Sequence, residues 1–283
     1  MGARPGRHLV WDWNGTLLDD LSLVIAATNA VFASLGAPRI DADHHRQRFR
    51  RPIADYYAEV LGRPVEPVEF DRLNYLFHEA YQAGMPCALT GDAPVALRGW
   101  SGTQSLLSMW FHEELVLALA SYRLTEHFTR VDGLRRRLGR EIDHKGPYLA
   151  DHLAALQLDG AEVVLIGDTV DDAHAAASVG AGCVLYAGGF TASQQLRATG
   201  YPVADSLVDA VALAAGDPAP PGRAAGSRHP AGSRPAAQSQ PAAQSPPAAQ
   251  SPPAAGSRPA AQSPPAARPA EVAGAAVDAS GPG

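Results

Sequence analysis

A short apolar run that ends abruptly in a carboxylate near the start of the chain constrains the fold most. Residues 9–11 read Leu-Val-Trp, and Asp12 and the polar turn at residues 14–16 follow them directly. A continuous apolar run of this kind suits a buried strand of a parallel sheet. In open α/β sheets, ligands bind just beyond the carboxyl ends of the strands. Asp12 is therefore expected in a functional crevice, the alternative being a strand that simply ends in an Asp-rich turn.

A second apolar run, at residues 163–166, also ends in acids. Gly167 follows it, and then Asp168 and, four residues later, Asp172. Carboxylates that gather at strand ends repel one another unless a cation joins them. Oxygen ligands with room for water favour Mg²⁺ over zinc. The two runs together predict a magnesium site at one edge of a sheet.

The remaining periodicity predicts an α/β fold, a doubly wound parallel sheet with a small helical cap inserted after strand one. Helical spacing covers residues 21–35, 53–61 and 70–81, and each segment stops at a glycine, which is typical of helix C-termini. Further along, the pattern predicts helices at 93–100, 103–111, 149–156 and 173–179, and strands at 115–120, 163–166 and 183–186. Such alternation favours βα units and a parallel sheet. The predicted core is residues 8–18 and 90–215 and the cap is residues 19–89; a helical subdomain of no special role is the alternative.

The C-terminal segment, residues 217–283, has a different composition. Pro, Ala, Ser and Gln dominate it, and a six-residue period starts at Pro235 and returns through Pro265. Such a segment cannot bury enough apolar surface to offset its ordering entropy. We expect a disordered, partly polyproline II tail. A proline-reading domain as its partner is one interpretation, and repeat expansion without a specific role is the other.

Charge and cysteine usage exclude several classes. Ahead of the tail the chain carries 18 Lys and Arg against 26 Asp and Glu, a net charge of −8, which argues against a nucleic-acid partner. The two cysteines, Cys87 and Cys183, have neither disulfide-framework nor zinc spacing. No run reaches eighteen apolar residues, so no membrane association is expected. The first strand starts within about eight residues, which leaves no room for a signal peptide and favours the cytoplasm.

Both acid-terminated runs resemble motifs of the haloacid dehalogenase (HAD) superfamily. Motif I of that family is an apolar strand followed by Asp-x-Asp-Gly-Thr-Leu-x-Asp, and motif IV is an apolar strand followed by Gly-Asp-Ser/Thr-x-x-Asp. Here Asp12 stands at the nucleophile position, Thr16 at the phosphate-binding hydroxyl and Gly15 at the close backbone approach. Asp168 and Asp172 match the acids of motif IV. The resemblance spans about residues 8–215, and its nearest subgroup is the C1-capped, phosphoglycolate-phosphatase-like enzymes.

Two weaker motifs complete the resemblance. Lys145 is the only lysine among 23 Lys and Arg residues, and it matches motif III, a lysine about 20–25 residues before the motif IV strand. A site that needs a compact point charge rather than a planar fork would retain lysine. Ser121 follows the predicted strand at 115–120 and matches motif II, an apolar strand ending in Ser or Thr. Chance survival of the lysine and an ordinary strand-end serine are the alternatives.

The resemblance implies a phosphatase acting on a small phosphorylated metabolite. It implies Mg²⁺ held by the Asp12 carboxylate, the Asn14 backbone carbonyl and Asp168, with Asp172 orienting a metal-bound water or the lysine. The aspartate at position 12 would attack phosphorus and form an aspartyl phosphate. Hydroxyl and amine groups of Thr16, Ser121 and Lys145 would stabilise charge on the transferring oxygens.

Asn14 departs from the family pattern, which usually has a second aspartate there. An amide cannot pass a proton, and loss of a general acid–base costs about 10²–10⁴ in rate. Three interpretations follow. The substrates have good leaving groups, such as acyl, aryl or anhydride phosphates; His44 or His45 of the cap carries the proton; or the protein binds phosphate, in a regulatory role, with little or no turnover.

The cap also carries Arg50 and Arg51, in the segment Phe-Arg-Arg-Pro. A cap loop over the active site often selects the substrate in this family, and an arginine there could hold a carboxylate or a second phosphate. A solvated basic face is the alternative.

A metal-free haloalkanoate dehalogenase is a third functional class, and the two acids of motif IV argue against it.

Overall fold

The computed structural model describes residues 7–135, 144–216 and 218. By its internal contacts the chain divides into two units, residues 1–228 and 229–283, and every described residue belongs to the first. The predicted tail therefore lies outside the described residues, apart from residue 218.

A parallel sheet forms the centre of the first unit. Its strands are β1 (His8–Trp11), β2 (Gln104–Phe111), β3 (Val131–Leu134), β4 (Val163–Gly167), β5 (Gly182–Tyr186) and β6 (Val203–Ala204). Their order across the sheet is β3-β2-β1-β4-β5-β6, and every neighbouring pair is parallel. Strand order reverses at β1, which pairs with β2 on one side and with β4 on the other. Such a switch point is where open α/β sheets bind ligands.

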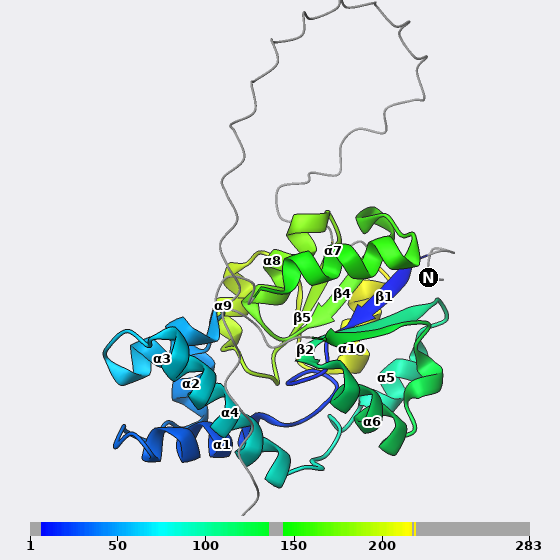
Figure 1. Cartoon of the computed structure of the whole chain (residues 1–283). Helices are drawn as coiled ribbons and strands as arrows, with labels where there is room; N and C mark the ends of the chain where they lie inside the picture. Colours follow the sequence, from blue (N-terminus) through cyan, green and yellow to red (C-terminus); the bar gives the residue numbers. More distant parts are fainter. Residues whose placement is uncertain (1–6, 136–143, 217, 219–283) are drawn as a thin grey trace, which may run out of the picture. The chain divides into compact units, whose positions relative to one another are not determined.

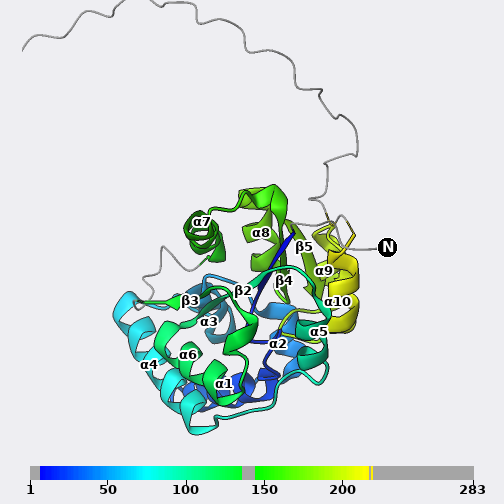
Figure 2. The ribbon, with the colours of Figure 1, turned by 90° about the vertical axis from the view of Figure 1, so that its right-hand side faces the viewer.

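Helices cover both faces of this sheet (Figures 1 and 2). The first face carries α5 (Ala93–Gly99), α6 (His112–Ser121) and α10 (Leu207–Ala214), and the second carries α7 (Lys145–Leu156) and α8 (Val170–Val179). Successive side chains of a strand point to opposite faces. Leu9 and Trp11 accordingly pack with the first group of helices, and Val10 packs with the second. This confirms the predicted doubly wound α/β class.

Between β1 and α5, the chain forms α1 (Leu21–Ala33), α2 (Ala42–Arg48), α3 (Ile53–Leu61) and α4 (Pro67–Ala83). In Figure 1 these blue and cyan helices gather beside the sheet. They have an apolar cluster of their own, which includes Phe32, Tyr57 and Phe70. Arg46 of α2 connects them to the core, since its Nε donates to the carbonyl of Gly189 at 3.0 Å.

Two of the predicted elements are wrong. Residues 115–120, predicted as a strand, lie within α6, and residues 103–111, predicted as a helix, contain the whole of β2. Short apolar runs do not distinguish a buried strand from a buried helix by periodicity alone. Glu113 and Glu114 occupy the first turn of α6, where acids favour a helix start. The predicted strands at 163–166 and 183–186 and the helix at 53–61 are confirmed.

None of the helices in the described residues is long and apolar enough to cross a membrane.

Candidate active site

Asp12 stands at the carboxyl end of the central strand. Its backbone N–H donates to the carbonyl of Ile166 at 2.9 Å, which continues the pairing of β1 with β4 by one residue. The backbone N–H of Trp13 then donates to Asp12 Oδ1 at 2.7 Å. Backbone contacts thus fix the carboxylate at the switch point of the sheet, as the sequence predicts.

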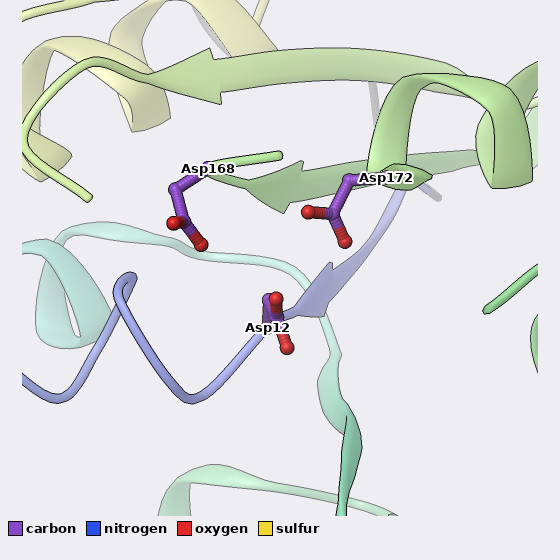
Figure 3. A group of neighbouring side chains, drawn as sticks. All are labelled: Asp12, Asp168 and Asp172. Atoms are coloured by element: carbon purple, nitrogen blue, oxygen red, sulfur yellow. The ribbon is translucent and has the colours of Figure 1, made fainter. Parts of the chain in front are cut away.

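The acids that follow β4 meet Asp12 at this edge (Figure 3). One carboxylate oxygen from each of Asp12, Asp168 and Asp172 lies within 4.8 Å of the others, and all three residues are buried. Thr169 caps α8 and turns the last acid inward: its backbone N and its Oγ1 donate to Asp172 Oδ2 at 3.0 and 2.6 Å. The predicted convergence of the two acid-terminated runs is therefore present in the structure.

Lys145 brings a positive charge into the same cluster. It is the first residue of α7, its side chain is 3% exposed, and its Nζ lies 2.8 Å from Asp12 Oδ2 and also contacts Asp172 Oδ1. Burial lowers the pKa of the lysine, but Asp12 and Asp172 more than offset it and hold the pKa above its ordinary value. The ammonium therefore remains charged next to the carboxylate at position 12.

The cluster has a surplus of negative charge. Three carboxylates and one ammonium leave a net charge of −2 when all are ionised. Burial raises the pKa of Asp12 to about 6, despite Lys145, and burial together with the neighbouring acids raises that of Asp168 well above its usual value. Oxygen donors with two uncompensated charges fit a hard divalent cation such as Mg²⁺. Asp12 and Asp168, with Asp172 beside them, are the residues that would hold it.

The turn after Asp12 packs directly on Asp168. A Cβ at Gly15 would lie 2.4 Å from Asp168 Oδ2, and the residue has φ of +72°, so glycine is required on both counts. The hydroxyl of Thr16 donates to Asp168 Oδ1 at 2.8 Å. Thr16 thus lies in the site, in contact with a candidate metal ligand; its predicted binding of phosphate stays a prediction.

Asn14 belongs to a buried polar network that the sequence did not reveal. Its Nδ2 donates to Asp20 Oδ2 at 2.8 Å and to the hydroxyl of Tyr81 at 3.1 Å, and that hydroxyl donates to the same Asp20 oxygen at 2.7 Å. Asp20 Oδ1 also accepts from the backbone N–H of Gly15 at 2.7 Å. Burial raises the pKa of Asp20 to about 6. The amide at position 14 is therefore matched to a neighbouring carboxylate.

The structure does not bring Ser121 into the site. Ser121 is the last residue of α6, it is exposed, and its Oγ donates to the carbonyl of Ala118 within the same helix. Because α6 begins just after β2, its far end lies about 15 Å along the helix axis from the sheet edge. The prediction of Ser121 as a strand-end hydroxyl is wrong for this reason. Ser108 of β2 is the buried hydroxyl found there, 3.4 Å from Asn14 Oδ1.

The two arginines of the cap have different surroundings. Arg50 pairs with Glu59 on α3 and does not line the cavity beside Asp12. Arg51 does line it, and its Nε lies 3.9 Å from Asp171 Oδ2. His45 also lines the cavity, but burial lowers its pKa to about 3. A neutral imidazole has no extra proton to donate near pH 7, which argues against His45 as the replacement acid.

Residues 145–210 match the family model described as HAD-hydrolase-like. No match was found among curated proteins.

Solved structures resemble the chain over most of its described length. A haloacid dehalogenase-like hydrolase from Streptococcus pneumoniae superposes with a TM-score of 0.62 and 20% identity, over 73% of this chain and 97% of its own. A predicted phosphatase from Clostridium acetobutylicum superposes with a TM-score of 0.63 and 13% identity, over 74% of this chain and 97% of its own. A predicted phosphoglycolate phosphatase from Haemophilus somnus superposes with a TM-score of 0.57 and 14% identity, over 75% of this chain and 100% of its own. These similarities show a shared fold.

Proposed function

We propose that this chain, whose fold is that of the haloacid dehalogenase-like hydrolases, is a Mg²⁺-dependent phosphatase that acts on a small phosphorylated metabolite through an aspartyl phosphate. One observation carries the proposal. The carboxylate of Asp12 lies at the switch point of the sheet, 2.8 Å from Lys145 Nζ, with oxygens of Asp168 and Asp172 within 4.8 Å.

Asp12 is the nucleophile in this proposal. One of its carboxylate oxygens forms a bond to phosphorus while the bond from phosphorus to the leaving oxygen breaks. Water then attacks the acyl phosphate and releases inorganic phosphate, which regenerates the free carboxylate. A bound Mg²⁺ would supply charge neutralisation between the nucleophile and the phosphoryl oxygens. Lys145 adds a fixed positive charge at the same place, and its contacts with the carboxylates of Asp12 and Asp172 keep it oriented.

The hydroxyl of Ser108 takes the role that the sequence assigned to Ser121. It is buried within β2, beside Asn14 and on the wall of the cavity that holds Asp12. A hydroxyl there can donate to a phosphoryl oxygen. Ser108→Ala should raise KM or lower kcat for a phosphate ester, whereas Ser121→Ala should change neither.

Turnover of p-nitrophenyl phosphate tests the function. We expect turnover with Mg²⁺, loss of turnover with EDTA, recovery when Mg²⁺ is restored, and loss in Asp12→Asn. Binding of phosphate or aluminium fluoride without turnover would instead support a phosphate-binding, regulatory role. Absence of both binding and turnover would refute the proposed site.

Asn14 determines which leaving groups the enzyme accepts. Because its amide donates to Asp20 and Tyr81, it is already committed to hydrogen bonds and offers no transferable proton. The proposed enzyme therefore favours esters whose leaving oxygen departs without protonation. Asn14→Asp combined with Asp20→Asn would return a carboxyl to position 14 while keeping an amide–carboxylate pair. A gain on alkyl phosphates is expected, and its absence would contradict the argument from the missing acid.

A further inference from the structure

The cavity beside Asp12 extends from the charged cluster into an aromatic enclosure. Its volume is about 150 Å³, and Asp12 and Lys145 line it together with residues of α1, α3, α4 and the segment after β5. The enclosing rings include Phe49, Tyr57, Phe70, Phe77, Trp110 and Phe190. An apolar protein cavity of about 150 Å³ holds one benzene molecule. The lining of the enclosure therefore suits an aromatic ring, and the volume, which the ring would share with the charged end of the cavity, leaves no room for a larger ring system.

Charge in the cavity does not favour a second anion on the substrate. Among the described residues that line it, the permanent cations are Lys145 and Arg51. Lys145 faces Asp12, and Arg51 Nε lies 3.9 Å from Asp171 Oδ2. A carboxylate on the leaving group would have to compete with Asp171 for Arg51, while an uncharged ring has no such competitor.

His45 supplies a polar point in the aromatic enclosure. It is 1% exposed and stacks on Phe49 with ring centroids 4.8 Å apart, and its Nδ1 lies 3.1 Å from the hydroxyl of Tyr56. Its Nε2 is buried and has no hydrogen-bond partner among the described residues. A buried polar atom normally has a partner, so this one is suited to a polar substituent of a ligand.

We infer, on the basis of the proposed phosphatase function, that the substrate is a phosphate monoester of a single-ring phenol that carries a polar substituent toward His45. The ring lies among the aromatic side chains of the cap, and its phosphate lies at Asp12 and Lys145. A phenolate leaves far more readily than an alkoxide. The substrate class thus matches the absence of a general acid at Asn14.

Binding of two non-hydrolysable phosphonates tests this inference separately from turnover. Phenylphosphonate and methylphosphonate carry the same anionic group, and only the first has a ring. In calorimetric titrations of the full chain with Mg²⁺, we expect phenylphosphonate to bind at least roughly tenfold more tightly, because the ring is removed from water. Equal affinities, or no measurable binding of phenylphosphonate, would overturn the inference. Lack of turnover on every ester would refute the phosphatase function instead.

A cavity-filling variant locates the ring. Asn74 of α4 lines the cavity and is half-buried, so Asn74→Phe should cancel most of the preference for phenylphosphonate. Val68→Phe is the matched control, since Val68 lies on the same helix, is 84% exposed and does not line the cavity. A preference that survives in Asn74→Phe, with the fold intact by circular dichroism, would place the ring elsewhere and overturn the inference.

A second variant tests the polar point. His45→Phe removes Nε2 and keeps an aromatic ring of similar size. We expect it to lower the affinity for 4-hydroxyphenylphosphonate by roughly tenfold relative to phenylphosphonate, which is the effect of one lost hydrogen bond. An unchanged ratio of the two affinities would overturn the assignment of His45.

Discussion

Asn14 and Asp20 offer the sharpest test of the buried network, because the amide of one donates to the carboxylate of the other at 2.8 Å. Asn14→Asp would place two carboxylates at that separation in a site where Asp20 is fully buried. Like charges in such contact cannot both ionise, so the folded variant must keep one proton on the pair. The unfolded chain, at neutral pH, keeps none.

The cost of that proton follows from the pKa of Asp20, which burial raises to about 6. Wild-type Asp20 releases its proton above that pH, whereas the carboxyl pair of the variant keeps one at pH 7.5, so the variant is less stable than the wild type by about 1.5 pH units, or about 2 kcal/mol at 1.36 kcal/mol per unit. The folded variant binds more protons than the unfolded chain, so its stability falls as pH rises above the unfolded carboxyl pKa of about 4. The wild type shares this fall up to about pH 6, where Asp20 releases its proton, so the deficit of the variant relative to the wild type opens above pH 6 and is nearly absent at pH 5.

Thermal unfolding of the wild type and Asn14→Asp at pH 7.5 and pH 5 measures this difference. We expect the variant to unfold about 4–8 °C below the wild type at pH 7.5 and within about 2 °C of it at pH 5. The double variant Asn14→Asp with Asp20→Asn restores an amide–carboxylate pair and should recover most of the loss at pH 7.5. A deficit that is the same at both pH values, or a double variant no more stable than the single one, would refute the reasoning.

Three further predictions concern the acid cluster. Lys145→Met should lower the free energy of unfolding by about 3–5 kcal/mol in denaturant titrations without Mg²⁺, because the buried carboxylate of Asp12 loses its partner. Lys145→Arg keeps the positive charge but should still lose phosphatase turnover, because a planar guanidinium does not fit that position. Affinity for Mg²⁺ should weaken at least about tenfold per pH unit below pH 6 in calorimetry, since Asp12, with a pKa raised to about 6, and Asp168, with a pKa raised well above its usual value, must release their protons to bind the ion; an affinity independent of pH between 5 and 7 would contradict this. Gly15→Ala should abolish turnover and destabilise the fold, since its Cβ would meet Asp168 Oδ2 at 2.4 Å. The control Gly62→Ala, with a similar φ of +66° and nothing within 4 Å, should lower the free energy of unfolding by only about 1 kcal/mol. Equal losses of stability in the two variants would show that backbone strain, not the contact, dominates.

The sequence predicted the convergence of Asp12, Asp168 and Asp172 correctly because the carboxyl ends of parallel strands lie at the same edge of the sheet. A run of apolar residues that ends in an acid fixes both the strand and the place where its last side chain points. Lys145 was predicted from its rarity in an arginine-rich chain and from its resemblance to motif III, and its Nζ contacts Asp12. The inference for the acids needed only local pattern and topology, whereas the inference for the lysine also needed the family resemblance.

The second strand was predicted wrongly, and this error led to the wrong residue being assigned to the site. Residues 104–111 and 115–120 are both short and apolar, and nothing in their periodicity says which one pairs with β1. The hydroxyl at the sheet edge was therefore assigned to Ser121 instead of Ser108. The acids at the start of α6 were the one local signal that could have corrected this.

What the sequence by itself determined is the α/β class, the sheet edge where the chemistry lies and the acids placed there, because strand period and strand-end residues are local properties; the lysine followed from its rarity and its resemblance to motif III. Only the tertiary structure decided what surrounds them. The hydrogen bonds that link Tyr81 to Asp20 and to Asn14 join residues 61 and 67 positions apart, and the aromatic enclosure around His45 includes Phe190 from a still more distant part of the chain. Their proximity depends on how α1 to α4 pack over the end of the sheet, and that packing is a property of the whole fold.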